Sequence, residues 1–179
     1  MKHGKKYDIT PYGTESMHVL RAEKGFIIVG QDTDGSVTPK DINMDWIVSK
    51  KKEDFLGKRS FSRSDTRRTD RKQLVGLLVN DKKTVLPEGS YVVDEAKPRP
   101  PMEMIGHVSS SYYSPTCDHP IALALIKNGL NRMGDVVKVP LMSGKVIEAT
   151  ITDSIFYDKE GVRNNENTNS PLQSKDQIK

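Results

Sequence analysis

The sequence predicts a β-rich α+β fold, with one helix near the start of the chain followed by a small antiparallel β-barrel or β-sandwich. The sheet is indicated by about six short apolar segments separated by Asn, Asp, Gly and Pro, the usual residues of turns. These segments are 74–79, 91–93, 103–111, 121–126, 136–139 and 146–151. The helix is indicated by residues 14–24, where apolar residues recur at helical spacing.

The predicted helix 14–24 has recognisable ends. Thr14 is a suitable N-cap, because its hydroxyl can accept a hydrogen bond from a free amide of the first turn. Met17 and Leu20 are expected to form the apolar face. Gly25 follows the last turn, where a left-handed exit residue is common.

Two further elements are expected after this helix. Residues 26–29 form a short apolar run, which favours a buried strand over a second helix. Thr38, Pro39 and Asp41 then have the spacing of a capped first turn with proline at its first position.

Glu23 is the most informative single residue of the helix. A carboxylate at a helix end, just before a buried strand, could stay charged at a pocket wall and accept paired N–H donors from a planar ring. The alternative is an exposed glutamate that pairs with Lys24 or another lysine, which is the usual fate of this residue type. The residues alone leave both interpretations open.

The composition allows one domain or two small ones in 179 residues, with 35% hydrophobic and 29% charged residues. The net charge of +4 suits anionic ligands such as polyglutamates or phosphates and does not require nucleic acid. A single cysteine, Cys117, excludes an internal disulfide framework. No apolar run approaches the roughly 20 residues of a membrane span, and no secretory signal is visible. A cytoplasmic protein with no membrane partner is therefore expected.

Residues 58–73 are polar and basic, which predicts an exposed linker between two parts of the chain. A nucleic-acid-binding arm is the alternative, but Asp65 and Asp70 interrupt its positive charge and only Phe61 could stack on a base. No nucleic-acid partner is therefore expected. Residues 162–179 are rich in Asn, Ser and Gln and are predicted to be a disordered tail.

The sequence contains no dinucleotide-binding glycine fingerprint, P-loop, H-E-x-x-H or nucleophile-elbow motif. Its four histidines do not have the spacing of metal ligands. No metal site and no catalytic residue are predicted from these patterns.

Several segments together resemble the glycine-cleavage T-protein (aminomethyltransferase) family. They are LRAEKGFIIVGQDTDG at 20–35, Thr38-Pro39, DWIVSKKKEDFLGK at 45–58, GHVSSSYYSPT at 106–116, IALALIKNG at 121–129 and DSIFYDKEG at 153–161. Within that family the chain looks most like the C-terminal part of the alpha subunits of heterotetrameric sarcosine oxidases. The resemblance extends over about residues 8–161.

The resemblance implies a division of the chain into three parts. Residues 1–70 would be the C-terminal portion of an aminomethyltransferase-like folate-binding domain, ending in the basic linker. Residues 71–161 would be the C-terminal β-barrel of a T-protein, and 162–179 the tail.

The resemblance also implies a site for tetrahydrofolate. In the family, the Glu of the R-x-E-x-G motif binds the pterin ring, and here that residue is Glu23. A basic cluster follows the Trp of the Thr-Pro segment, and within it Lys52, with Lys51, would contact a folate carboxylate. A lysine there would supply a point charge, where relatives with arginine have a fork of donors. Tyr112 and Tyr113 would face this site from the barrel, or else belong to the core.

The implied function is capture of the one-carbon unit of oxidised sarcosine on tetrahydrofolate, which gives 5,10-methylenetetrahydrofolate and glycine. A folate-dependent aminomethyltransferase and a non-catalytic folate-binding or assembly module are the alternatives. Flavin and NAD would be bound only by other parts of the complex. The expected partners are other sarcosine oxidase subunits or the missing first half of the folate-binding domain, which in the family holds the assisting aspartate. Without that half the chain is expected to be inactive, and its exposed barrel surface predicts self-association.

Overall fold

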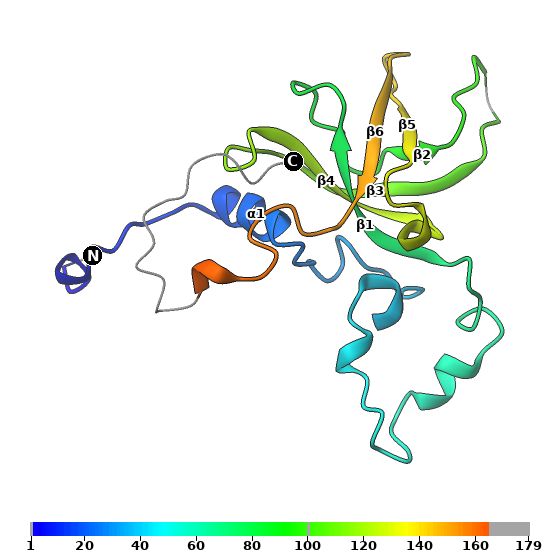
Figure 1. The fold of residues 1–179 in the computed structure, drawn as a ribbon, viewed down its shortest axis with the longest axis horizontal. Helices are drawn as coiled ribbons and strands as arrows, with labels where there is room; N and C mark the ends of the chain where they lie inside the picture. Colours follow the sequence, from blue (N-terminus) through cyan, green and yellow to red (C-terminus); the bar gives the residue numbers. More distant parts are fainter. Residues whose placement is uncertain (1, 100, 165–179) are drawn as a thin grey trace.

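The computed structural model describes residues 2–99 and 101–164, and its main feature is a closed antiparallel β-barrel (Figure 1). The strands are β1 (Lys72–Val79), β2 (Tyr91–Val93), β3 (Met104–Ser114), β4 (His119–Lys127), β5 (Val136–Pro140) and β6 (Val146–Thr152). Their order around the barrel is β1-β4-β3-β2-β5-β6, and β6 pairs with β1 to close it. The β-rich fold class is therefore confirmed, and of the two predicted sheet arrangements the barrel is correct.

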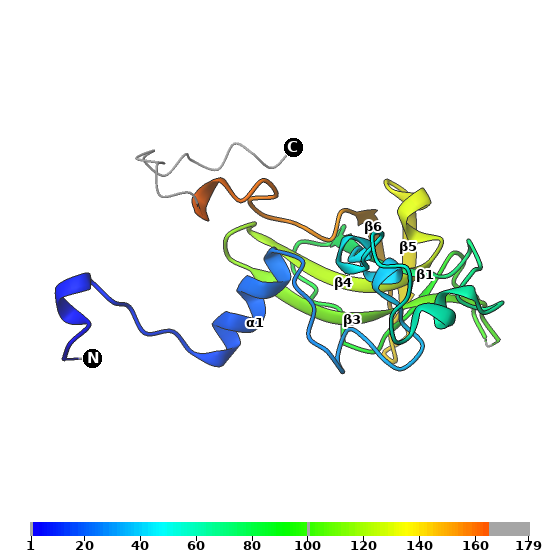
Figure 2. The same cartoon turned by 90° about the horizontal axis from the view of Figure 1, so that it is seen from below.

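The part of the chain before the barrel contains one α-helix, α1 (Thr14–Glu23), and short 3-10 turns. These turns are η1 (Lys5–Tyr7), η2 (Pro39–Ile42), η3 (Asp45–Ile47) and η4 (Lys58–Ser62), and η5 (Gly129–Arg132) and η6 (Val162–Asn164) lie later in the chain. Figure 2 shows α1 beside the strands β3 and β4, which it contacts. The N-terminal segment is thus attached to the outside of the barrel.

The barrel has an inner and an outer apolar cluster, and both include residues of β1 and β4. Val75 and Leu77 of β1 point inward with Ala124 of β4, whereas Leu74 and Leu123 point outward. The outward residues are covered by partly buried side chains of the flanking segments, namely Ile27, Val37, Ile42 and Phe156. This double burial explains why β4 is apolar on both faces, since neither face meets water.

Gly76 allows the chain after the barrel to lie against β1. It sits on the outer face of the strand, where an added Cβ would collide with the backbone oxygen of Asp153 and the ring of Phe156. The glycine therefore lets residues 153–156 approach closely, and this brings Phe156 and Tyr157 to the end of α1.

The predicted helix is confirmed, but two of its details are wrong. The N-cap is Gly13, not Thr14, and it makes no side-chain capping bond. Met17 and Leu20 are 44% and 51% exposed, while Ala22 at the other end is buried. The helix contacts the barrel through His18 and its last turn, and Met17 and Leu20 do not form a buried face. Gly25 adopts the predicted left-handed conformation, with φ +69°.

The predicted strand at 26–29 is wrong. These residues form an irregular loop, in which Val29 is 84% exposed and Ile27 packs on the outer cluster. A closed barrel leaves no free edge with which this segment could pair, so its apolar residues cover the outside of the barrel one at a time.

The predicted turn at Thr38-Pro39 is confirmed as the 3-10 helix η2. Asp41 accepts hydrogen bonds from the Thr38 backbone N–H and hydroxyl, both at 2.8 Å. Arg71, which directly precedes β1, pairs with the same carboxylate at 2.8 Å. Asp41 therefore joins this turn to the start of the barrel.

Replacing Asp41 by asparagine is expected to lower the free energy of unfolding by about 2 kcal/mol at pH 7, because hydrogen bonds to a charged group are lost. Burial alone would raise the pKa of Asp41, but hydrogen bonds from Arg71 and Thr38 outweigh it, and the pKa lies below its usual range. This stabilisation is present above the unfolded pKa of about 3.9 and is lost as the pH falls through the folded pKa.

Urea unfolding between pH 7 and pH 3 measures both effects. The Asp41→Asn variant should lose less stability than wild type as the pH falls, while the exposed Asp45→Asn should follow wild type. An unchanged free energy at pH 7 would contradict the role given to Asp41.

In the basic segment 58–73, two arginines form ion pairs with acidic residues of the same segment. Arg68 pairs with Asp70 at 2.8 Å, and Arg71 pairs with Asp65 at 2.5 Å. The polar linker predicted at 58–73 ends two residues earlier than expected, because β1 already begins at Lys72.

Two observations concern the described residues only. No helix among residues 2–99 and 101–164 is long and apolar enough to cross a membrane. The same residues contain no group of three or more His, Cys, Asp or Glu side chains that could hold a metal ion.

The tail predicted at 162–179 begins with η6, and its residues 165–179 lie outside the described part.

Candidate ligand-binding site at the end of helix α1

Glu23 is the last residue of α1 and is 2% exposed. Its Oε1 atom accepts a hydrogen bond of 2.6 Å from the hydroxyl of Ser114, the last residue of β3. Its backbone oxygen accepts the amides of Phe156 and Tyr157 at 2.9 and 3.1 Å. The alternative of an exposed glutamate paired with Lys24 is therefore wrong, and Lys24 instead pairs with Asp158.

The second carboxylate oxygen of Glu23, Oε2, has no hydrogen-bond donor among the residues that the structure describes. Oε2 is also not completely enclosed by protein atoms. A buried carboxylate is stabilised when hydrogen bonds satisfy both oxygens. The site can therefore accept at least one N–H or O–H donor from a ligand.

Cys117 lies close to this carboxylate. Its thiol is buried, and burial raises its pKa, with the nearby charge of Glu23 acting in the same direction. The thiol is therefore neutral near neutral pH, and it supplies no charge that would compete for a ligand of Glu23.

A buried ion pair lies beside Glu23 and was not singled out from the sequence. The Arg21 and Asp32 side chains are 9% and 0% exposed, and their closest atoms are 2.6 Å apart. Asp32 also accepts the hydroxyls of Ser109 and Ser110 at 2.5 and 2.6 Å, and the Ile28 amide at 2.9 Å. The pair joins α1, the following loop and β3, and so holds the helix end against the barrel.

Tyr112 lies on the same side of β3 as this cluster. Its hydroxyl oxygen is 3.4 Å from Arg21 Nη2, and its ring stacks on His18 with centroids 6.4 Å apart. Tyr113 points the other way and donates to Asp118, because successive residues of a strand face opposite sides. Of the two predicted tyrosines, only Tyr112 contacts α1.

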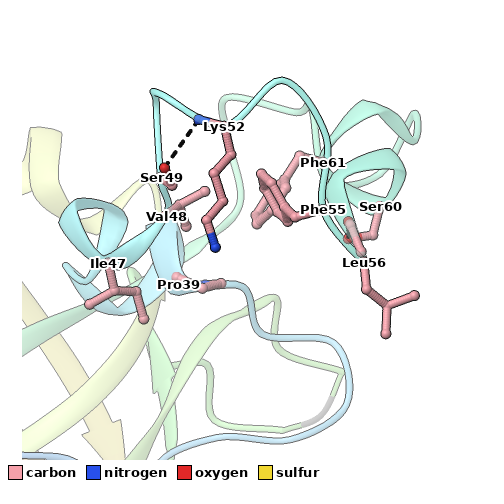
Figure 3. A pocket seen from close by; sticks show the side chains of 10 residues that line it. Pro39, Ile47, Val48, Ser49, Lys52, Phe55, Leu56, Ser60 and Phe61 are labelled. Carbon is pink, nitrogen blue, oxygen red and sulfur yellow. Dashed lines mark hydrogen bonds between the residues drawn. The ribbon is translucent and has the colours of Figure 1, made fainter.

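Lys52 lies at a different place. It extends into a hollow of about 380 Å³, where Figure 3 shows its ammonium between Val48 and Phe55, directed toward Pro39. The other lining residues are Ile47, Ser49, Leu56, Gly57, Ser60 and Phe61. No acidic partner of this ammonium occurs in the described part of the chain. Lys51 is exposed and does not line the hollow.

The predicted site residues thus fall into two groups. Glu23 and Tyr112 meet where α1 contacts β3, whereas Lys51 and Lys52 belong to the loop after η3. Figure 1 shows this loop, in cyan, well apart from α1. Within the described residues, the pair Glu23 and Tyr112 does not contact the pair Lys51 and Lys52.

The fold and the site define the class of this protein: a closed six-stranded barrel that carries a buried carboxylate on an attached helix. Residues 72–158 match the family described as the glycine cleavage T-protein C-terminal barrel domain, and residues 1–52 match the GCVT N-terminal domain. The chain belongs to the glycine cleavage T-protein family.

The chain is similar to relatives that are much longer. It is 54% identical to the sarcosine oxidase subunit alpha of Corynebacterium sp. (strain P-1) over 89% of this chain and 16% of the relative. It is 31% identical to the aminomethyltransferase of Thermotoga petrophila, with 86% of this chain and 39% of that protein aligned. The crystal structure of aminomethyltransferase T from Bartonella henselae matches with a TM-score of 0.70 and 26% identity, over 82% of this chain and 39% of that one. The chain thus spans about a sixth of one kind of relative and two fifths of the other.

Proposed function

We propose that this chain contributes the tetrahydrofolate-binding part of a sarcosine-oxidase-type enzyme. The observation that carries the proposal is the Glu23 carboxylate, which is buried, held by Ser114 through Oε1 and without a donor on Oε2 in the described part of the chain. This carboxylate stands in the motif L-R-A-E-K-G, at the position where the family binds the pterin ring. In this proposal residues 1–70 belong to the folate-binding domain and 71–161 to the barrel.

The acceptor oxygens of Glu23 suit the aminopterin edge of tetrahydrofolate. That edge offers adjacent N–H donors, and a carboxylate is an acceptor that binds such a pair in a planar, charge-assisted arrangement. Bound tetrahydrofolate would supply the nucleophilic nitrogens that take up the one-carbon unit of oxidised sarcosine, which leaves glycine. The role of Glu23 is to orient the ring, so its contribution is positioning without covalent catalysis.

Lys52 is proposed to bind a carboxylate of the folate glutamate. Its ammonium has no acidic partner in the described residues and lies in a hollow walled by Val48, Phe55 and Phe61. An unpaired cation beside apolar and aromatic side chains suits an anionic ligand with an apolar stem. Lys51 is exposed like Lys52 but lies outside the lining, so it would add long-range attraction only.

Two other functions have some support. The similarity to aminomethyltransferases, at 31% identity, favours folate-dependent transfer from a protein-bound aminomethyl group as the second candidate. The higher identity to the sarcosine oxidase alpha subunit favours the first. A non-catalytic folate-binding or assembly module remains the third and would bind folate without supporting either reaction.

The N-terminal segment is proposed to meet the remaining part of a family folate-binding domain, on this or another polypeptide. Its exposed apolar side chains include Phe26, Val29, Trp46 and Leu56, and Leu56 is fully exposed. Large apolar side chains left exposed on a folded protein are expected where another part of a protein covers them. The aminomethyltransferase of Thermotoga petrophila, of which this chain spans 39%, is a longer chain. Flavin and NAD would be held by other parts of the complex.

Calorimetric titration with 5-formyltetrahydrofolate, a stable reduced folate, tests the proposed function. Saturable binding at one site per chain is expected. Replacing Lys52 by alanine should weaken it about 3-fold, because an exposed ion pair contributes little. Lys40→Ala is the matched control and should bind as wild type does, since Lys40 lies outside the hollow. Absence of saturable binding by the wild-type chain would overturn the proposal, and equal affinity of the Lys52 variant would remove Lys52 from the site.

A further inference from the structure

Ser114 is the residue that contacts the Glu23 side chain directly. It is fully buried at the end of β3, and its Oγ lies 2.6 Å from Glu23 Oε1. The two residues are 91 positions apart in the chain, so this bond closes a long-range contact between the barrel and α1. Ser114 directly precedes the turn of residues 115–118, which joins β3 and β4 and contains Cys117.

The turn fixes the direction of the Ser114 hydroxyl. The backbone N–H of Cys117 donates to Ser114 Oγ at 2.9 Å. A hydroxyl has one proton to donate, and an ionised carboxylate only accepts. The Cys117 amide therefore occupies an acceptor position of Oγ, and the hydroxyl proton is directed to Glu23. The hydrogen bonds run in one direction, from Cys117 N–H to Ser114 O–H to Glu23 Oε1.

We propose that Ser114 is a positioning residue, which holds the plane of the Glu23 carboxylate so that Oε2 faces the ligand. The last torsion of a glutamate side chain is broad and has no strong preference of its own. The fixed Ser114 hydroxyl on Oε1 removes this rotational freedom. The remaining lone pairs of the carboxylate then keep one orientation toward a planar pair of N–H donors of the ligand. The inference rests on the proposed function, because it assigns Ser114 a role toward the ligand that Glu23 binds.

The first test compares two ligands on Ser114→Ala. Affinity for 5-formyltetrahydrofolate should fall about 10-fold or more, as expected for loss of a hydrogen bond to a charged group. Affinity for p-aminobenzoyl-glutamate, which lacks the pterin ring, should stay unchanged. Ser111→Ala is the matched control: its hydroxyl is also buried on β3 but contacts the Ile121 backbone oxygen at 3.4 Å, not Glu23. This control should bind both ligands as wild type does.

A double-mutant cycle with Glu23→Ala, which removes the acceptor of the Ser114 hydroxyl, provides the second test. Ser114→Ala should add no further loss once Glu23 has been replaced, because the two residues act as one unit. Ser114→Thr, which keeps the hydroxyl, should restore most of the affinity. If the alanine variant does not fold, Ser114→Cys keeps the side-chain size with a much weaker donor and should show the same selective loss.

The outcomes separate the two proposals. Wild-type affinity in Ser114→Ala, or an equal loss for both ligands, would overturn the positioning role while the folate site stands. Failure of the wild-type chain to bind 5-formyltetrahydrofolate would overturn the proposed function, and this inference with it.

Discussion

Glu23→Gln is expected to weaken binding of 5-formyltetrahydrofolate about 100-fold. Glutamine fills the same volume and can still accept from Ser114, but it replaces one acceptor oxygen by an NH₂ group and removes the charge. The N–H donors of the ligand would then face the NH₂ donor of glutamine inside a buried site. Two buried donors without an acceptor are far less favourable than a cavity without polar groups. Titration calorimetry of both proteins at one pH and salt concentration measures the difference.

The control for this prediction is Glu15→Gln, on the same helix. Glu15 lies in the exposed first turn of α1, so its variant should bind like wild type. Circular dichroism should show that both variants keep the barrel. If Glu23→Gln bound the folate with wild-type affinity, Glu23 would have no part in the site.

The barrel strands were predictable because each is a short apolar segment between turn residues. All six predicted segments overlap observed strands, and 91–93 matches β2 residue for residue, whereas 103–111 stops three residues before the end of β3. The residues alone did not decide between barrel and sandwich. That choice depends on whether β6 reaches β1, and the contact between Val79 and Ala149 joins positions 70 residues apart. Local patterns do not encode such closure.

The N-terminal segment was predicted less well, because its apolar residues are not distributed by helix or strand periodicity. Met17 and Leu20 have helical spacing yet face outward, while Ile27 and Phe156 cover the barrel from segments far apart in the chain. A closed barrel has an outer surface without free edges, so irregular segments can cover it. Sequence periodicity carries no signal for this kind of packing.

The site was predicted in part. Glu23 was singled out from its place in the sequence, but its burial depends on Ser114 at the far end of β3. Arg21 and Asp32 were missed because charged residues are usually exposed. The available signal was their opposite charge on either side of the apolar run 26–29, at positions 11 residues apart. Burial of such a pair becomes visible only when β3 supplies the hydroxyls of Ser109 and Ser110.

Asp32→Asn is expected to lower the free energy of unfolding by about 3–5 kcal/mol, the largest stability effect foreseen for a single polar substitution in this chain. Asp32 accepts three hydrogen bonds besides its ion pair, and its removal leaves the Arg21 charge buried with a neutral partner. Breaking one side of a buried pair is more destabilising than replacing both sides. The double variant Arg21→Met, Asp32→Asn should therefore lose less stability than the two single variants added together.

Urea unfolding monitored by circular dichroism measures these free energies, with Asp34→Asn as the matched control. Asp34 lies two residues further on, is exposed and bonds only within its own turn, chiefly to Ser36, so its loss should change stability by less than about 1 kcal/mol. The Asp32 effect should also reach the ligand site, because Arg21 and Glu23 lie on the same last turn of α1 and both bond to β3. Equal stability of the Asp32 and Asp34 variants would show that the pair does not hold the helix end against the barrel.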